Sequence, residues 1–133
     1  MGQTPEGKIK AMVKKGLASL KAKPYVFMPV QSGFGSTTLD FLACVGGRFI
    51  AIETKADITK QLTPRQVATM DYIHLAGGTV FVVYDQTTCD EMIAQLIIML
   101  EFDPDAACPS PPFHRQNPIL LAFGAAQGKG PAK

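Results

Sequence analysis

The sequence of residues 39–55, LDFLACVGGRFIAIETK, contains two apolar runs separated by a pair of glycines. This pattern predicts a β-hairpin, because glycine accepts the positive φ angles that a two-residue turn between antiparallel strands requires. If Gly46 and Gly47 form that turn, counting outward along both strands pairs Asp40 with Glu53. Directly opposed side chains share one face of a sheet, so we expect these two carboxylates to be neighbours.

The expected pair of acids is accompanied by a lysine, since Lys55 follows Glu53 by two positions and shares its face of the strand. Carboxylates are hard oxygen ligands. Because no His or Cys accompanies these two acids, they suit Mg²⁺ or Mn²⁺ better than Zn²⁺. A bound divalent ion lowers the pKa of a coordinated water and stabilises charge on a phosphate, and a lysine can orient that water. The hairpin therefore predicts phosphodiester hydrolysis. The alternative interpretation is an exposed Glu53–Lys55 ion pair, with Asp40 as a strand cap.

The composition favours one globular α/β domain, because the chain has 133 residues and 47% of them are hydrophobic. The longest apolar stretch, residues 92–100, is too short to span a bilayer, and no signal-peptide core follows the lysine-rich start. We therefore expect a cytoplasmic protein. The three cysteines, Cys44, Cys89 and Cys108, include no close pair and predict reduced thiols.

Charge is distributed unevenly along the chain. Residues 1–65 contain ten Lys and Arg against four acids, whereas residues 66–133 contain three against seven. This asymmetry is typical of a face that binds a polyanion such as DNA, although a solvated lysine-rich helix gives the same pattern. The candidate nucleic-acid contacts are Lys8, Lys14, Lys15, Lys60 and Arg65.

Periodicity and capping signals predict the remaining elements. Thr4-Pro5-Glu6 and Thr63-Pro64 are typical helix starts, and two glycines end the second helix. The expected elements are a helix over 4–21, a strand over 25–30, a loop over 31–38, the hairpin, a helix over 63–76, a strand over 79–84 buried on both faces, and a helix over 88–100. Residues 101–133, rich in Pro and Gly, form an expected tail or arm, which leaves residues 1–100 as the domain.

Two polar side chains are expected to turn inward from these helices. Glu6 falls within the apolar stripe of the first helix, and Gln66 shares the inner side of the second helix with Met70 and Ile73. Each has an ordinary alternative role, Glu6 as a first-turn acid and Gln66 as a polar residue near a cap. His74 lies on the apolar side of its helix, where a core histidine is more common than a metal ligand.

These residues together resemble the PD-(D/E)xK nuclease superfamily, and within it the VRR-NUC (virus-type replication-repair nuclease) family. The resemblance covers residues 4–85 and is most specific in the hairpin, in the run LTPRQ at 62–66 and in AGG at 76–78. It implies a mixed central sheet with a β-hairpin flanked by helices, in the order α-β-β-β-α-β-α. We expect the site residues to surround one cavity.

The resemblance also implies roles for individual residues. Asp40 and Glu53 would bind Mg²⁺ or Mn²⁺ with the main-chain carbonyl of Thr54, Lys55 would be the catalytic lysine, and Gln66 would support the site. Glu6 would hold a second ion or a water.

The resemblance further implies an endonuclease for branched or structured DNA, such as junctions or flaps, which works as a homodimer in a bacterial or phage-infected cell. The chain alone leaves open two other functions: a catalytically silent nucleic-acid-binding module with the same fold, and hydrolysis of a small phosphoester.

Overall fold

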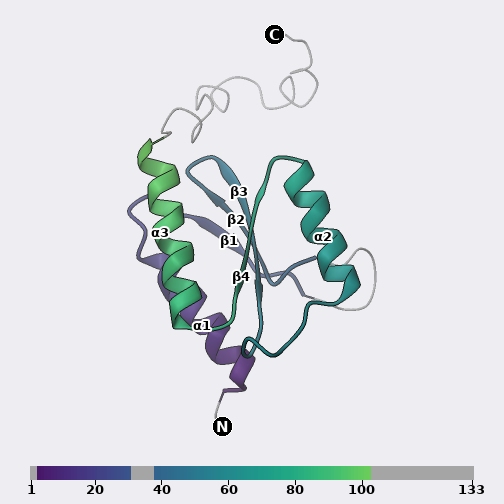
Figure 1. The fold of residues 1–133 in the computed structure, drawn as a ribbon. Coiled ribbons are helices and arrows are strands. Elements are labelled where there is room, and N and C mark those ends of the chain that lie inside the picture. The colour runs from purple at the N-terminus through teal and green to yellow at the C-terminus, as the bar shows by residue number, and fades with distance from the viewer. Residues whose placement is uncertain (1–2, 31–37, 103–133) are drawn as a thin grey trace.

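The computed structural model of the chain describes residues 3–30 and 38–102. They form a four-stranded mixed sheet with three helices (Figure 1), in the predicted order α-β-β-β-α-β-α. The elements are α1 (Pro5–Ala18), β1 (Tyr25–Phe27), β2 (Phe41–Val45), β3 (Arg48–Thr54), α2 (Pro64–Leu75), β4 (Thr79–Val83) and α3 (Gln86–Phe102). The α/β fold class predicted from the sequence is therefore confirmed.

The hairpin of β2 and β3 has the predicted turn and register. Gly46 and Gly47 have φ angles of 57° and 82°, values at which a side chain would be strained. The antiparallel ladder pairs Val45 with Arg48 at the turn and Phe41 with Ile52 at the far end. Asp40 immediately precedes this last pair and Glu53 immediately follows it, so both acids continue the ladder on the same face of the sheet.

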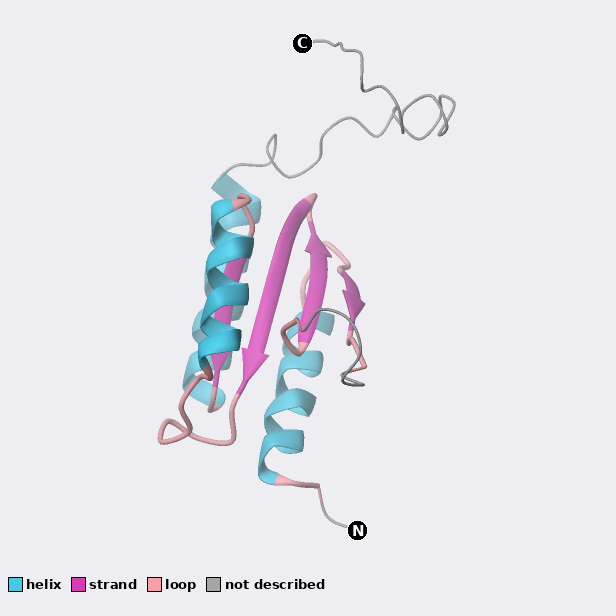
Figure 2. Ribbon diagram, turned by 90° about the vertical axis from the view of Figure 1, so that its right-hand side faces the viewer, coloured by secondary structure: helices cyan, strands magenta, loops and turns pink. Residues whose placement is uncertain are grey.

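The strand order is β1-β2-β3-β4, with β3 and β4 parallel and the other neighbours antiparallel. Figure 2 shows these directions as arrows, with β2 opposed to β3. The parallel pair is joined through α2, which covers one face of the sheet, whereas α1 and α3 cover the other face (Figure 1). Helices thus flank the sheet on both sides, and the carboxyl end of β3 lies next to the start of α2.

The hydrophobic core lies between the sheet and the α1–α3 layer. Phe41, Ile50 and Ile52 from the hairpin pack against buried side chains of both helices, including Leu17. Gly16 permits the close approach of α1 to α3, because a Cβ at that position would lie 3.1 Å from side-chain atoms of Ile93. The α2 side is shallower, and none of the α2 residues is fully buried.

Several element boundaries differ from the sequence prediction, and α3 also extends to Phe102, beyond its predicted end at residue 100. Helix α1 ends at Ala18 rather than near residue 21. Strand β1 stops at Phe27, before Pro29, which has no N–H to donate to a ladder. Helix α3 begins at Gln86 rather than 88 because Asp85 caps it, accepting hydrogen bonds from the main-chain N–H and the hydroxyl of Thr88.

Two burial predictions are wrong. Strand β4 is not buried on both faces, since only Val83 is fully buried and its other residues are partly exposed. The reason is its position at the end of the strand order, where it has one partner among the described strands. His74 is exposed rather than part of the core, because α2 covers its face of the sheet only loosely.

Within the described residues, no helix has the length and apolar character needed to cross a membrane. The predicted loop at 31–38, except Thr38, and the predicted arm from residue 103 onward lie outside the described residues.

Candidate active site

Glu53 is the central buried carboxylate of the predicted site. It lies near the end of β3 and is 3% exposed. Its Oε2 atom accepts a hydrogen bond of 2.6 Å from Nε2 of Gln66 and lies 3.7 Å from the ammonium of Lys55. Lys55 thus contacts the carboxylate on the face that the strand alternation predicts.

The start of α2 fixes the orientation of Gln66. Its Oε1 atom accepts a hydrogen bond of 3.0 Å from the main-chain N–H of Thr63, and its own main-chain N–H donates to the Thr63 hydroxyl at 3.1 Å. This reciprocal pair is a capping box. Because the amide oxygen is used by the helix cap, the amide NH₂ group is directed to Glu53.

Asp40 is held by the strand that bears Glu53. Its Oδ2 atom accepts hydrogen bonds from the main-chain N–H of Thr54 at 3.0 Å and from the Thr54 hydroxyl at 2.6 Å. Thr54 is fully buried, so the hydroxyl that donates to Asp40 is fixed by packing. The Asp40 side chain is 15% exposed and therefore largely shielded from water.

The environment raises the pKa of Glu53 from 4.5 to about 7. The largest cause is burial, which penalises the charged carboxylate, and the negative charge of Asp40 acts in the same direction. The ammonium of Lys55 and a hydrogen bond from the Asp40 main chain oppose both effects. A buried glutamate beside a partly buried aspartate, with Lys55 compensating its charge only in part, is a site at which an added cation is electrostatically favourable.

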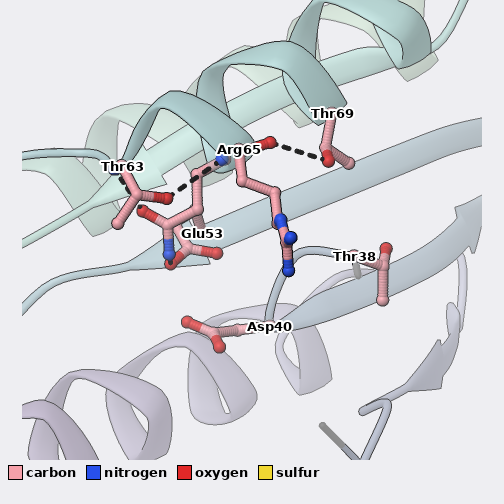
Figure 3. A pocket seen from close by; sticks show the side chains of 7 residues that line it. Thr38, Asp40, Glu53, Thr63, Arg65 and Thr69 are labelled. Atoms are coloured by element: carbon pink, nitrogen blue, oxygen red, sulfur yellow. Dashed lines mark hydrogen bonds between the residues drawn. The ribbon is translucent and has the colours of Figure 1, made fainter. Parts of the chain in front are cut away.

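A cavity of about 190 Å³ opens beside these acids. Figure 3 shows side chains that line this cavity. The Arg65 side chain extends from α2 toward the part of the cavity where Asp40 lies. The lining residues are Thr38, Asp40, Glu53, Thr63, Arg65, Gln66 and Thr69. Of the predicted nucleic-acid contacts, Arg65 lies at this cavity, whereas Lys8, Lys14, Lys15 and Lys60 are exposed and do not line it.

Five site residues were expected to surround one cavity: Glu6, Asp40, Glu53, Lys55 and Gln66. Only Asp40, Glu53 and Gln66 line it. Lys55 joins them through its contact with Glu53. Glu6 does not point into the core, because it lies in the first turn of α1, before the first buried residue, and its side chain is 43% exposed.

Lys10 connects Glu6 to the site, and sequence reasoning missed it. Its ammonium lies 3.9 Å from Glu6 Oε2 and 3.8 Å from Asp40 Oδ1. The sequence contains a signal for its contact with Glu6, since Lys10 follows Glu6 by one helical turn, whereas its contact with Asp40 depends on tertiary packing.

The carboxylates of Asp40 and Glu53 are hard oxygen donors of the kind that Mg²⁺ or Mn²⁺ prefers. Asp40 and Glu53 lie on one sheet face, and burial together with the charge of Asp40 raises the pKa of Glu53. In the part of the chain that the structure describes, no group of three or more His, Cys, Asp and Glu side chains is placed to hold a metal ion. The two acids fit such an ion only with further ligands from main-chain carbonyls or water, so the Thr54 carbonyl stays a predicted ligand.

Comparison with known proteins gives a match at the level of the fold. No family model and no curated protein matches the sequence. A solved structure described as "VRR_NUC domain" matches with a TM-score of 0.60 and 22% sequence identity, over 69% of this chain and 97% of that chain. The architecture that the sequence resemblance implied is confirmed: this chain has the fold of a VRR_NUC domain.

Proposed function

We propose that this chain is a Mg²⁺- or Mn²⁺-dependent endonuclease of the VRR-NUC family, which hydrolyses phosphodiester bonds in branched or structured DNA. The observation that carries the proposal is the contact network around Glu53. The network comprises an adjacent aspartate, a lysine at 3.7 Å and a glutamine at 2.6 Å that a helix cap holds in place. The VRR_NUC fold supports the same conclusion independently of these contacts.

Each residue has a definite task in this proposal. Asp40 and Glu53, with the Thr54 carbonyl, hold the divalent ion, which when bound polarises the phosphate and acidifies water. Lys55 orients the attacking water or shares the charge that develops on the phosphate oxygens. Gln66 keeps the Glu53 carboxylate in position, and Glu6 holds a water or a second ion.

Arg65 is the cation best placed to contact the substrate, because it lines the cavity beside both acids. A guanidinium binds phosphate oxygens with two parallel hydrogen bonds. We assign Lys8, Lys14, Lys15 and Lys60 to more distant backbone contacts, since all four are exposed. We assign the nuclease to the part of the chain that ends with α3 at Phe102, two residues beyond the boundary predicted at residue 100, and a separate arm to the rest of residues 101–133. We place the activity in the cytoplasm of a bacterial or phage-infected cell.

The test is cleavage of linear, flap, nicked and four-way DNA with Mg²⁺ or Mn²⁺. We expect D40N and K55M to reduce the rate by about 100-fold or more. D71N is a matched control, because Asp71 is an exposed α2 acid outside the cavity and the same charge is removed. Full activity in D40N or K55M would refute the proposal.

Q66E separates the role of Gln66 in the site from its role in the helix. A glutamate retains an oxygen that accepts the Thr63 N–H, so the capping box survives. It removes the N–H donor to Glu53 and places a third carboxylate there. We therefore expect cleavage to fall strongly while α2 remains folded by circular dichroism.

The competing function is a catalytically silent module that binds nucleic acid. It is favoured by the basic first part of the chain, which contains ten Lys and Arg within residues 1–65. It predicts salt-sensitive DNA binding without product at any metal concentration.

We also propose that the chain forms a homodimer, and the exposed aromatic side chains on β1 and β3 support this proposal. Tyr25, Phe27 and Phe49 are 71%, 51% and 49% exposed, and Cys44 links two of them in the register. Exposed aromatic surface of this kind marks protein interfaces. We expect light scattering to give a dimer for the wild-type chain and a monomer for F27E.

A further inference from the structure

The ammonium of Lys10 lies between two carboxylates of different elements. It is 3.9 Å from Oε2 of Glu6, on the same helix, and 3.8 Å from Oδ1 of Asp40, which precedes β2. The Lys10 side chain is 35% exposed, so it reaches the acids from the solvent edge and has room to move away.

The two oxygens of Asp40 have different partners. Oδ2 accepts both hydrogen bonds from Thr54, which is fully buried. Oδ1 is the oxygen that faces Lys10. If Asp40 keeps both contacts with Thr54, Oδ1 is the oxygen that it would offer to a divalent ion, and Oδ1 is the oxygen beside this ammonium.

We propose that Lys10 is a positioning residue that competes with the divalent ion for Asp40 and Glu6. Without metal, its ammonium holds the two carboxylates together across the α1–β2 boundary. The ammonium would have to leave when a divalent ion bound Oδ1, because two cations at the same oxygen repel each other. This inference rests on the proposed function for the existence of the metal site, and it adds a residue that sets the metal concentration at which the site fills.

The variants distinguish competition from a structural role. K10M removes the competing charge while keeping a side chain of similar length, whereas K10R keeps the charge. K21M is the matched control: Lys21 is exposed beyond the opposite end of α1, so the same charge is lost far from Asp40.

The experiment is a Mn²⁺ titration of the full chain without DNA, followed by electron paramagnetic resonance of the free ion. We expect K10M to bind Mn²⁺ roughly tenfold more tightly than wild type. We expect K10R and K21M to remain within about twofold of wild type, since a distant exposed charge is screened. D40N reports whether the binding occurs at this site and should abolish it.

Equal or weaker Mn²⁺ binding by K10M would overturn the inference, because Lys10 would then organise the ligands or be irrelevant to them. Absence of binding in both wild type and K10M would overturn it as well. Tighter binding by K10M in a chain that cleaves no DNA would sustain the competition while refuting the nuclease. DNA cleavage together with equal Mn²⁺ affinity in wild type and K10M would refute the competition and sustain the nuclease.

Discussion

Replacement of Glu53 by glutamine should stabilise the metal-free protein at neutral and alkaline pH. The side chain is 3% exposed, and its environment raises its pKa from 4.5 to about 7. Glutamine has nearly the same shape, carries no charge and retains an oxygen that accepts the hydrogen bond from Gln66. The substitution therefore removes the cost of a buried charge without leaving a cavity.

The size and direction of the effect follow from the pKa of Glu53. Below about pH 4.5 the group is protonated in the folded and unfolded chains, so its burial carries no electrostatic cost. As the pH rises toward 7 the unfolded chain releases the proton first, and the folded protein loses stability. Each pH unit between these values contributes about 1.4 kcal/mol, which gives a loss of about 3 kcal/mol once the pH exceeds 7.

The assay is urea unfolding of wild type and E53Q in EDTA between pH 4.5 and 8. The difference between the two free energies of unfolding cancels the contributions of ionisable groups far from position 53 and leaves the effect of Glu53 with its immediate neighbours. We expect this difference to be small at pH 4.5 and to favour E53Q by up to about 3 kcal/mol at pH 8. Added Mn²⁺ should stabilise the wild type and leave E53Q nearly unchanged.

A free-energy difference that does not change with pH would refute the reasoning, since it would mean that Glu53 ionises as easily in the fold as in the unfolded chain. Destabilisation of E53Q at pH 8 would refute it differently, by showing that the Lys55 and Gln66 contacts outweigh burial. A matched measurement on D71N should show neither effect, because Asp71 is exposed.

Three further substitutions test the structure around the site. T63A removes the hydroxyl that caps α2 and should cost about 1 kcal/mol in urea unfolding, and we also expect slower DNA cleavage because Gln66 loses half of its reciprocal contact. G46A places a side chain at a φ of 57° and should lower the free energy of unfolding by about 1–2 kcal/mol, with unchanged stability contradicting the turn. G16V pushes a branched side chain toward Ile93, 3.1 Å from a Cβ, and should lower the melting temperature through about 1–3 kcal/mol of overpacking; an unchanged melting temperature would contradict close α1–α3 packing.

The hairpin could be predicted from the sequence because its information is local. Two glycines fix the length of the turn, the length fixes the register, and the register places Asp40 and Glu53 on one face. The position of Gln66 could also be predicted, since a Thr followed three residues later by Gln marks the start of a helix. Its contact with Glu53 required only that α2 begin near the end of β3.

The errors arose where the outcome depends on distant elements. An apolar run such as 79–83 is compatible with a central strand or an edge strand, and only the strand order decides how much of it is buried. The prediction that the Glu6 side chain faces the core came from helical periodicity. Periodicity defines one side of α1 but not how far along the helix that side is buried. Lys10 was missed for the same reason, because its proximity to Asp40 depends on how α1 is placed against β2.

The contacts that stabilise the fold around Glu53 also make the charged form of this carboxylate unfavourable. The capping box of α2 and the buried Thr54 fix Gln66 and Asp40, and both of these residues then act on Glu53. Burial and the neighbouring aspartate make its negative charge costly, and the single ammonium of Lys55 compensates only in part. A hydrophobic residue at position 53 would avoid that cost, whereas the function proposed above gives the carboxylate a use, since a bound cation would offset the cost of its charge.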